Sequence, residues 1–163
     1  AAGVVLPGVG AFGACMDAVR SAGLEGPALA TVADGRPFLG VCIGMQLLYE
    51  ASEESPGVPG LGVLPGTVRR LPEGLKRPQM QWNALAVRRP SKLLEGLPDP
   101  AWVYFVHGYA AERPDADEVV ATAPYGVDVV AVVDRDNVAA TQFHPEKSGT
   151  NGLRLLRNWV EAL

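Results

Sequence analysis

The pentapeptide Gly40-Val41-Cys42-Ile43-Gly44 constrains the fold of this chain more than any other segment. It follows the apolar run Phe38–Val41, which is typical of a buried strand, and it precedes a stretch of helix-forming residues. A nucleophile between two glycines at this spacing indicates a nucleophile elbow, a tight strand–turn–helix in which a neighbouring Cβ would crowd the backbone. At the start of the helix, Cys42 would feel the positive end of the macrodipole, which favours the thiolate. A buried structural cysteine at a strand end is the alternative interpretation.

The segment Phe143-His144-Pro145-Glu146 supplies a chemical partner for such a cysteine. Pro145 keeps His144 extended, so that His144 and Glu146, two positions apart, can point the same way. A histidine that activates a cysteine, with a carboxylate orienting the imidazole, is the triad arrangement of acyl transfer. Taken alone, His144 fits a surface histidine after a strand better than a catalytic one, and we assign His107 a structural role.

The apolar pattern predicts an α/β fold in which strands and helices alternate at first, followed by a run of strands and a closing helix. Strands are expected at 4–6, 38–41, 67–69, 82–87, 102–106, 119–123, 129–133 and 138–143, and helices at 12–22, 27–33, 43–50 and from about 151. Asp134–Asn137 indicates a hairpin turn. We expect a mainly parallel sheet with an antiparallel part, within a single domain spanning residues 1–163.

The segment Gly8–Gly13 fits the G-x-G-x-x-G pattern of dinucleotide-binding folds. Such folds place an acidic residue at the end of the second strand, whereas here that strand ends at Val41-Cys42 and Asp34 precedes it. We therefore expect no dinucleotide and no other cofactor. The same glycines can form a flexible turn that aims a backbone N–H at an oxyanion.

Composition excludes several classes of function. The chain carries 14 basic against 18 acidic residues, with no basic run longer than two, which argues against a nucleic-acid platform. No apolar stretch approaches the length that spans a bilayer, and no leader precedes a cleavage site. Two cysteines cannot form a disulfide framework. We expect a cytoplasmic domain without nucleic-acid, membrane or metal partners.

Three segments, at residues 6–13, 38–50 and 143–149, resemble the class I glutamine amidotransferases. The Pro-Gly-Val-Gly-Ala-Phe-Gly turn and the Lys-Ser-Gly after His-Pro-Glu narrow the resemblance to the glutaminase subunits of imidazole glycerol phosphate synthase, which act in histidine biosynthesis. The resemblance covers residues 1–163 and implies a three-layer, flavodoxin-like mixed sheet flanked by helices. Relative to that family, the abrupt start at Ala1 leads us to expect that the first strand and helix are lacking.

The resemblance implies a role for each residue of the triad. Cys42 would attack the side-chain amide of glutamine, His144 would carry the proton to the departing ammonia, and Glu146 would orient His144. One oxyanion donor would be the N–H of Ile43, and the other would be the N–H of Val9 in the turn Gly8-Val9-Gly10.

The resemblance also implies binding residues. Gln46, Glu54 and Tyr109 match positions that hold or border the glutamine substrate. Trp82 and Lys147 match positions that face the partner, a (βα)8-barrel cyclase that receives the ammonia.

The chain departs from the family pattern at three positions near these residues. Gln79 and Gln81 flank Met80 where His and Gly are usual, and Gly108 precedes Tyr109 where Ser or Thr is usual. Two other functions are compatible with these motifs. One is a stand-alone cysteine hydrolase of the same superfamily, similar to γ-glutamyl hydrolase. The other is a non-catalytic docking subunit.

Overall fold

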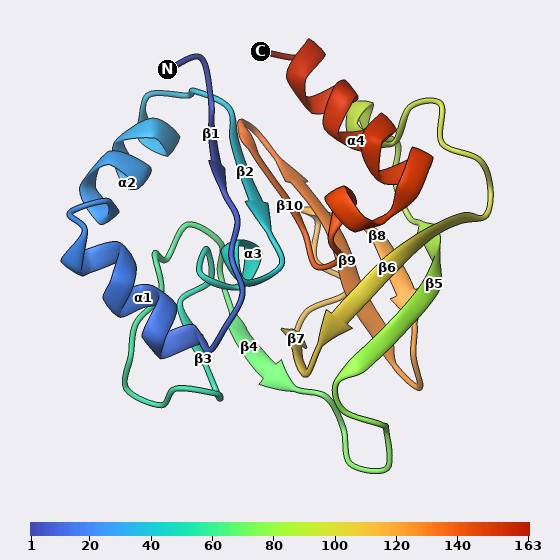
Figure 1. Cartoon of the computed structure of the whole chain (residues 1–163), viewed down its shortest axis with the longest axis horizontal. Coiled ribbons are helices and arrows are strands. Elements are labelled where there is room, and N and C mark those ends of the chain that lie inside the picture. Colours follow the sequence, from blue (N-terminus) through green and yellow to red (C-terminus); the bar gives the residue numbers. More distant parts are fainter.

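A seven-stranded sheet, in the order β1-β2-β10-β9-β8-β5-β6, forms the centre of the molecule, and the computed structural model describes all residues from 1 to 163 (Figure 1). Its strands are β1 (Val4–Leu6), β2 (Phe38–Val41), β5 (Gln79–Val87), β6 (Ala101–His107), β8 (Val119–Pro124), β9 (Asp128–Arg135) and β10 (Val138–Thr141). A smaller sheet joins β3 (Ala51–Ser52), β4 (Thr67–Arg70) and β7 (Tyr109–Ala111). Of these strands, the sequence pattern did not predict β3 and β7.

The expectation of a mainly parallel sheet is wrong. Only β1–β2 and β2–β10 pair in parallel, and the pairs from β10 to β6 are antiparallel. The reason is the length of the connections, since β8, β9 and β10 follow one another through short turns that can join only antiparallel neighbours. The predicted hairpin between β9 and β10 is confirmed, with Val138 opposite Arg135 and Asp136 at a φ of 54°.

Helices cover both faces of the sheet, as the three-layer expectation required. The helices α1 (Phe12–Ser21) and α2 (Glu25–Ala33) lie on one face, and α4 (Gly149–Glu161) lies on the other (Figure 1). Successive residues of β10 face opposite layers: Val138 and Ala140 belong to the α1 core, whereas Ala139 belongs to the α4 core.

Helix α3 (Ile43–Gln46) is shorter than the predicted helix at 43–50. Beyond Gln46 the backbone carbonyls accept hydrogen bonds from a later segment of the same chain. The carbonyl of Leu47 accepts the N–H of Leu61 at 2.7 Å, and that of Leu48 accepts the N–H of Leu64 at 2.9 Å. This tertiary pairing replaces the next helical turn, which residue propensity alone cannot reveal.

The elbow between β2 and α3 has the backbone that its glycines predicted. Cys42 has φ 54° and ψ −109°, an uncommon conformation for a residue with a side chain. A Cβ on Gly44 would lie 1.7 Å from the carbonyl oxygen of Leu6, and a Cβ on Gly40 would lie 2.8 Å from the carbonyl oxygen of Gly44. The elbow therefore depends on a close backbone approach between the end of β1 and the start of α3.

No helix in the structure has both the length and the apolar character that crossing a membrane requires.

Replacing Gly44 by alanine should destabilise the fold by about 3 kcal/mol or more, because the new methyl group overlaps backbone that cannot move aside cheaply. The control is Gly108→Ala, since a Cβ there meets nothing within 4 Å. Its free energy of unfolding should stay within about 1 kcal/mol of the wild type. Urea unfolding of the three proteins measures both values, and equal stabilities for the two variants would contradict the close approach.

Candidate active site

The parallel pairing of β2 with β10 brings the two predicted catalytic segments to one edge of the sheet. Val41 lies opposite Thr141, and the N–H of Cys42 donates to the carbonyl of Thr141 at 2.8 Å. Cys42 therefore leaves β2 where Gln142 leaves β10, followed by Phe143 and His144. The carboxyl ends of parallel strands are where open α/β sheets place their ligands.

His144 has the extended backbone expected before a proline, with φ −95° and ψ 100°. Its Nδ1 lies 2.6 Å from Oε1 of Glu146, whose side chain is half exposed. The N–H of His144 donates to the carbonyl of Tyr104 at 3.1 Å, and its own carbonyl accepts the Ser148 hydroxyl at 2.6 Å. The opposite ring nitrogen, Nε2, is buried without a hydrogen-bond partner. The backbone and the carboxylate thus fix a ring that leaves one buried nitrogen available.

The Cys42 thiol is buried, and the expectation of a lowered pKa is wrong for the structure described here. Burial raises the pKa of this thiol to about 11, and the charge of Glu146 adds to the rise. The N–H of Ile43, the charge of Lys147 and the Gln142 amide act in the opposite direction but do not outweigh burial. Helix α3 has only four residues, so its dipole is small. The thiol is therefore protonated at neutral pH, and a nucleophile would have to be made by proton transfer.

Gln142 is a site residue that the motif search missed. Its side chain is fully buried, with Nε2 3.9 Å from Sγ of Cys42 and Oε1 3.2 Å from Nε2 of Gln46. The same Nε2 of Gln46 donates to the carbonyl of Tyr109 at 3.1 Å. The signal available in the sequence was a polar residue in an apolar strand, immediately before Phe143-His144.

The glycine turn predicted as an oxyanion donor lies against the elbow. A Cβ on Gly8 would approach Cγ2 of Ile43 to 2.9 Å. Gly10 has a φ of 121°, which residues with side chains rarely adopt. Val9 is exposed, and its carbonyl oxygen lies 3.5 Å from Sγ of Cys15. The glycine turn therefore lies next to Ile43, the first residue of α3.

Glu54, expected at the substrate, caps the N-terminus of α1. Its Oε1 accepts the N–H of Phe12 at 2.8 Å, and the Ser55 hydroxyl accepts the N–H of Gly13 at the same distance. The structure thus gives Glu54 a structural role just after the glycine turn.

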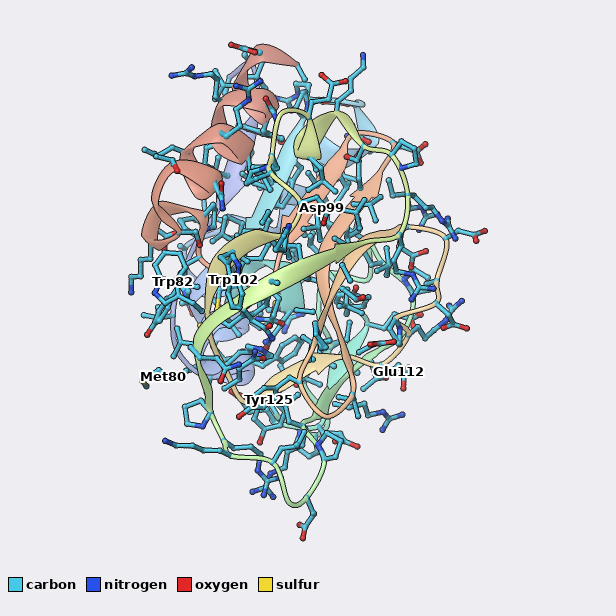
Figure 2. The ribbon with its side chains drawn as sticks, turned by 90° about the vertical axis from the view of Figure 1, so that its right-hand side faces the viewer. Met80, Trp82, Asp99, Trp102, Glu112 and Tyr125 are labelled. Atoms are coloured by element: carbon cyan, nitrogen blue, oxygen red, sulfur yellow. The ribbon has the colours of Figure 1, made fainter.

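The residues expected to face a partner, Trp82 and Lys147, lie on β5 and on the turn that follows His144. Trp82 is about half exposed, and its Cη2 would lie 4.0 Å from a Cβ placed on Gly149. Lys147 is exposed in the 3₁₀ turn η2 (Pro145–Lys147). Across the strand pair, Trp82 lies opposite Tyr104, with ring centroids 6.0 Å apart. Figure 2 shows Met80, Trp82 and Trp102 on β5 and β6, and each is about half exposed or more.

His107 is buried, as its structural assignment requires. Its Nδ1 lies 2.9 Å from the carbonyl oxygen of Tyr109, and its Nε2 lies 2.8 Å from the Gln79 carboxamide. Burial lowers the pKa of His107 to about 4, and the charge of His144 acts in the same direction. No group of three or more His, Cys, Asp and Glu side chains is arranged to hold a metal ion.

The buried His107 should make stability depend on pH. Its pKa is about 4 in the folded protein and 6.5 without burial, so the unfolded chain binds more protons between these values. Stability is therefore lost as pH falls from 6.5 towards 4, by on the order of 3 kcal/mol. Urea unfolding at several pH values in this range gives the free energy of unfolding, which should depend less steeply on pH in His107→Gln than in the wild type. An identical pH dependence in the two proteins would contradict the buried neutral ring.

The comparisons with known proteins agree with this geometry. A family model described as "Glutamine amidotransferase class-I" matches residues 2–163. The chain is 52% identical over 160 residues to a Methanothermobacter thermautotrophicus protein named "Imidazole glycerol phosphate synthase subunit HisH", which covers 98% of this chain and 79% of that protein. A Thermococcus kodakarensis protein of the same name is 50% identical over 161 residues, covering 96% and 80%.

Solved structures show the same fold. One described as "Crystal structure of glutamine amidotransferase" has a TM-score of 0.73 at 27% identity, covering 98% of this chain and 77% of the other. PurLQS from Thermotoga maritima has a TM-score of 0.74 at 18% identity, covering 99% and 79%. The predicted fold class and family resemblance are confirmed, and the chain belongs to the class I glutamine amidotransferases.

Proposed function

We propose that this protein is the glutaminase subunit of an imidazole glycerol phosphate synthase. It hydrolyses glutamine to glutamate and ammonia, and the ammonia serves the synthase reaction of histidine biosynthesis. The two named relatives, each about 50% identical, support this function. The observation that carries it is the His144 ring, whose Nδ1 is held by Glu146 at 2.6 Å while the buried Nε2 has no partner.

The proposed reaction begins with proton transfer, because burial keeps the Cys42 thiol protonated. Nε2 of His144 takes the proton as sulfur attacks the side-chain carbonyl carbon of glutamine. The same proton then passes to the leaving nitrogen, so ammonia departs and a thioester remains on Cys42. Water, deprotonated by His144, attacks the thioester, glutamate is released, and the proton passes from His144 to the leaving Cys42 sulfur, which restores the thiol. Glu146 orients the ring and stabilises its charged form in both halves of the reaction.

The tetrahedral oxyanion needs two donors. We assign one to the N–H of Ile43, which already lowers the pKa of the Cys42 thiol. We assign the other to the turn Gly8-Val9-Gly10, through the N–H of Val9. This assignment is supported by the close approach of Gly8 to Ile43 and by the flexibility that the glycines allow.

Substrate binding is assigned to Gln46, Tyr109 and Glu54. Both hydrogens of the Gln46 amide nitrogen are used by Tyr109 and Gln142, so its Oε1 is the atom that can accept from the α-ammonium group of glutamine. Glu54 spends one oxygen on the N-terminus of α1, and its second oxygen provides the negative charge for the same ammonium.

We further propose that Trp82 and Lys147 face the partner, which the family resemblance predicts to be a (βα)8-barrel cyclase. The support is the exposed apolar face of β5 and β6, where Met80, Trp82 and Trp102 lie (Figure 2). Exposed aromatic side chains of this size are the usual anchors of protein interfaces. The proposal also places the enzyme in the cytoplasm, where both free cysteines, Cys15 and Cys42, would stay reduced.

Replacing Cys42 by alanine should lower the rate of glutamine hydrolysis by about three orders of magnitude or more, because the only proposed nucleophile is lost. Ammonia release is measured with the barrel partner and its nucleotide ligand present. Cys15→Ala is the matched control and should stay within about twofold of the wild type, since the Cys15 side chain packs against the α1 core and makes a single hydrogen bond, to the carbonyl of Val9. Retained ammonia release in Cys42→Ala would overturn the mechanism, and a high rate without any partner would favour the stand-alone hydrolase.

Truncating Trp82 to alanine should weaken binding to the barrel partner about tenfold or more, because a large, half-exposed ring at the centre of the apolar face is removed. Val127→Ala removes an exposed apolar side chain in the turn between β8 and β9, and its dissociation constant should not change. Isothermal titration with the partner measures both. Equal affinities for the two variants would place the interface elsewhere.

A further inference from the structure

A continuous series of buried polar groups joins the start of β5 to the proposed nucleophile. Gln79 contacts Nε2 of His107 at 2.8 Å, and Nδ1 of His107 contacts the carbonyl of Tyr109 at 2.9 Å. That carbonyl and Oε1 of Gln142 both accept from the amide nitrogen of Gln46. Gln142 then places its Nε2 3.9 Å from the Cys42 sulfur. The catalytic steps above use neither Gln79, His107 nor Gln142.

The direction of each hydrogen bond follows from two constraints. A backbone carbonyl can only accept, so Nδ1 of His107 must carry the proton, and Nε2 of the neutral ring must then accept. A carboxamide oxygen cannot serve that nitrogen, whereas the amide nitrogen of Gln79 is buried without any partner. Turning the Gln79 carboxamide by a half rotation pairs its amide nitrogen with Nε2 of His107, and such orientations are assigned from the hydrogen-bond network. Gln79 therefore donates to His107.

The same reasoning fixes the carboxamide next to the thiol. The Gln46 amide nitrogen donates to Oε1 of Gln142 at 3.2 Å, so the oxygen of Gln142 is held away from sulfur and its N–H faces it. If the Gln142 carboxamide turned over, its oxygen would face the sulfur and oppose the thiolate. Because Gln46 also donates to the carbonyl of Tyr109, the bond from His107 to that carbonyl helps to hold Gln46 in place.

We propose that Gln142 is a further catalytic residue, which donates a hydrogen bond to the Cys42 sulfur as it becomes a thiolate. Gln79 and His107 are positioning residues that keep the Gln142 carboxamide in the donating orientation through Tyr109 and Gln46. No bond is made or broken at these groups. The proposal rests on Cys42 being the nucleophile of the proposed function.

This series begins directly beside the exposed apolar face. In β5, adjacent residues point to opposite sides of the sheet, so Gln79 is fully buried while Met80 is exposed. The pairing of Gln79 with His107 across β5 and β6 places their side chains on the buried side. A partner bound to the exposed face would therefore touch the strand from which the chain of hydrogen bonds starts.

The test is the pH dependence of Cys42 alkylation by iodoacetamide in the full chain, followed by peptide mass analysis, which needs no glutamine hydrolysis. In Gln142→Leu the apparent pKa of Cys42 should rise, and its alkylation rate at pH 8 should fall about threefold to tenfold. The charged groups that act on this thiol, Glu146 and Lys147, are unchanged in this variant, and so is the proposed base, His144. Cys15 serves as the internal control and should react at the same rate in every variant.

Two further variants separate the roles. Gln81→Leu alters an exposed glutamine on the same strand and should leave the Cys42 profile unchanged. Gln79→Leu should raise the apparent pKa of Cys42 as Gln142→Leu does, but by a smaller amount. An unchanged apparent pKa in Gln79→Leu would overturn the role of Gln79. A Gln142→Leu profile that superimposes on the wild type, or a parallel change at Cys15, would overturn the role of Gln142. If the profile shifts as expected but Cys42→Ala still hydrolyses glutamine, the assignment of Cys42 as the nucleophile fails, although the hydrogen bond to its sulfur stands.

The histidine tautomer gives a readout independent of any reaction. The chain contains two histidines, so the ring nitrogen signals of His107 and His144 can be assigned by comparison with His107→Gln. Nitrogen NMR at pH 7 should show His107 protonated at Nδ1 and accepting at Nε2. A ring protonated at Nε2 would overturn the donation from Gln79.

Discussion

The parallel contact between β2 and β10 is the constraint on which the site depends. It joins segments about one hundred residues apart, since the amide of Gln142 reaches the sulfur of Cys42. The pairing puts the carboxyl ends of two strands at one edge of the sheet, so one strand delivers the cysteine and the next delivers the histidine. Loss of this register by one residue would turn every side chain of β10 to the opposite face.

The site also depends on a close approach of two backbone segments that leaves no room for a side chain. The carbonyl of Leu6 lies so close to Gly44 that no Cβ fits, and this approach holds the glycine turn beside Ile43. The positive φ of Cys42 is maintained by the strand before it and the helix after it. Strained backbone of this kind persists only where the surrounding structure holds it in place, and here the helices packed on both faces of the sheet do so.

Burial has opposite effects on two ionisable groups of the candidate site, Cys42 and His107. It raises the pKa of the Cys42 thiol and lowers that of His107, so both are neutral at neutral pH. A thiolate at Cys42 therefore requires a base that accepts its proton, and the proposed base, His144, has a buried ring nitrogen without a partner. The reactivity of Cys42 therefore depends on where the His144 ring is held.

The sequence predicted those features that short motifs encode. The elbow glycines, the extended His144 and the β9–β10 hairpin all reflect local steric rules, and each is confirmed. The rest depends on distant contacts. The early end of α3 comes from carbonyls that pair with Leu61 and Leu64, and the hydrogen bonds of Gln142 involve residues far away in the chain. The thiol pKa follows burial, which a pentapeptide does not disclose.

In the proposed mechanism Cys42, and no other residue, forms the covalent bond with glutamine. The most direct measurement is labelling by a glutamine-like chloroketone, with each cysteine-containing peptide identified by mass. Cys42 should be labelled in proportion to the loss of glutaminase activity, Cys15 should stay unlabelled, and added glutamine should protect Cys42. Equal labelling of both cysteines, or inactivation with Cys42 unmodified, would contradict this mechanism.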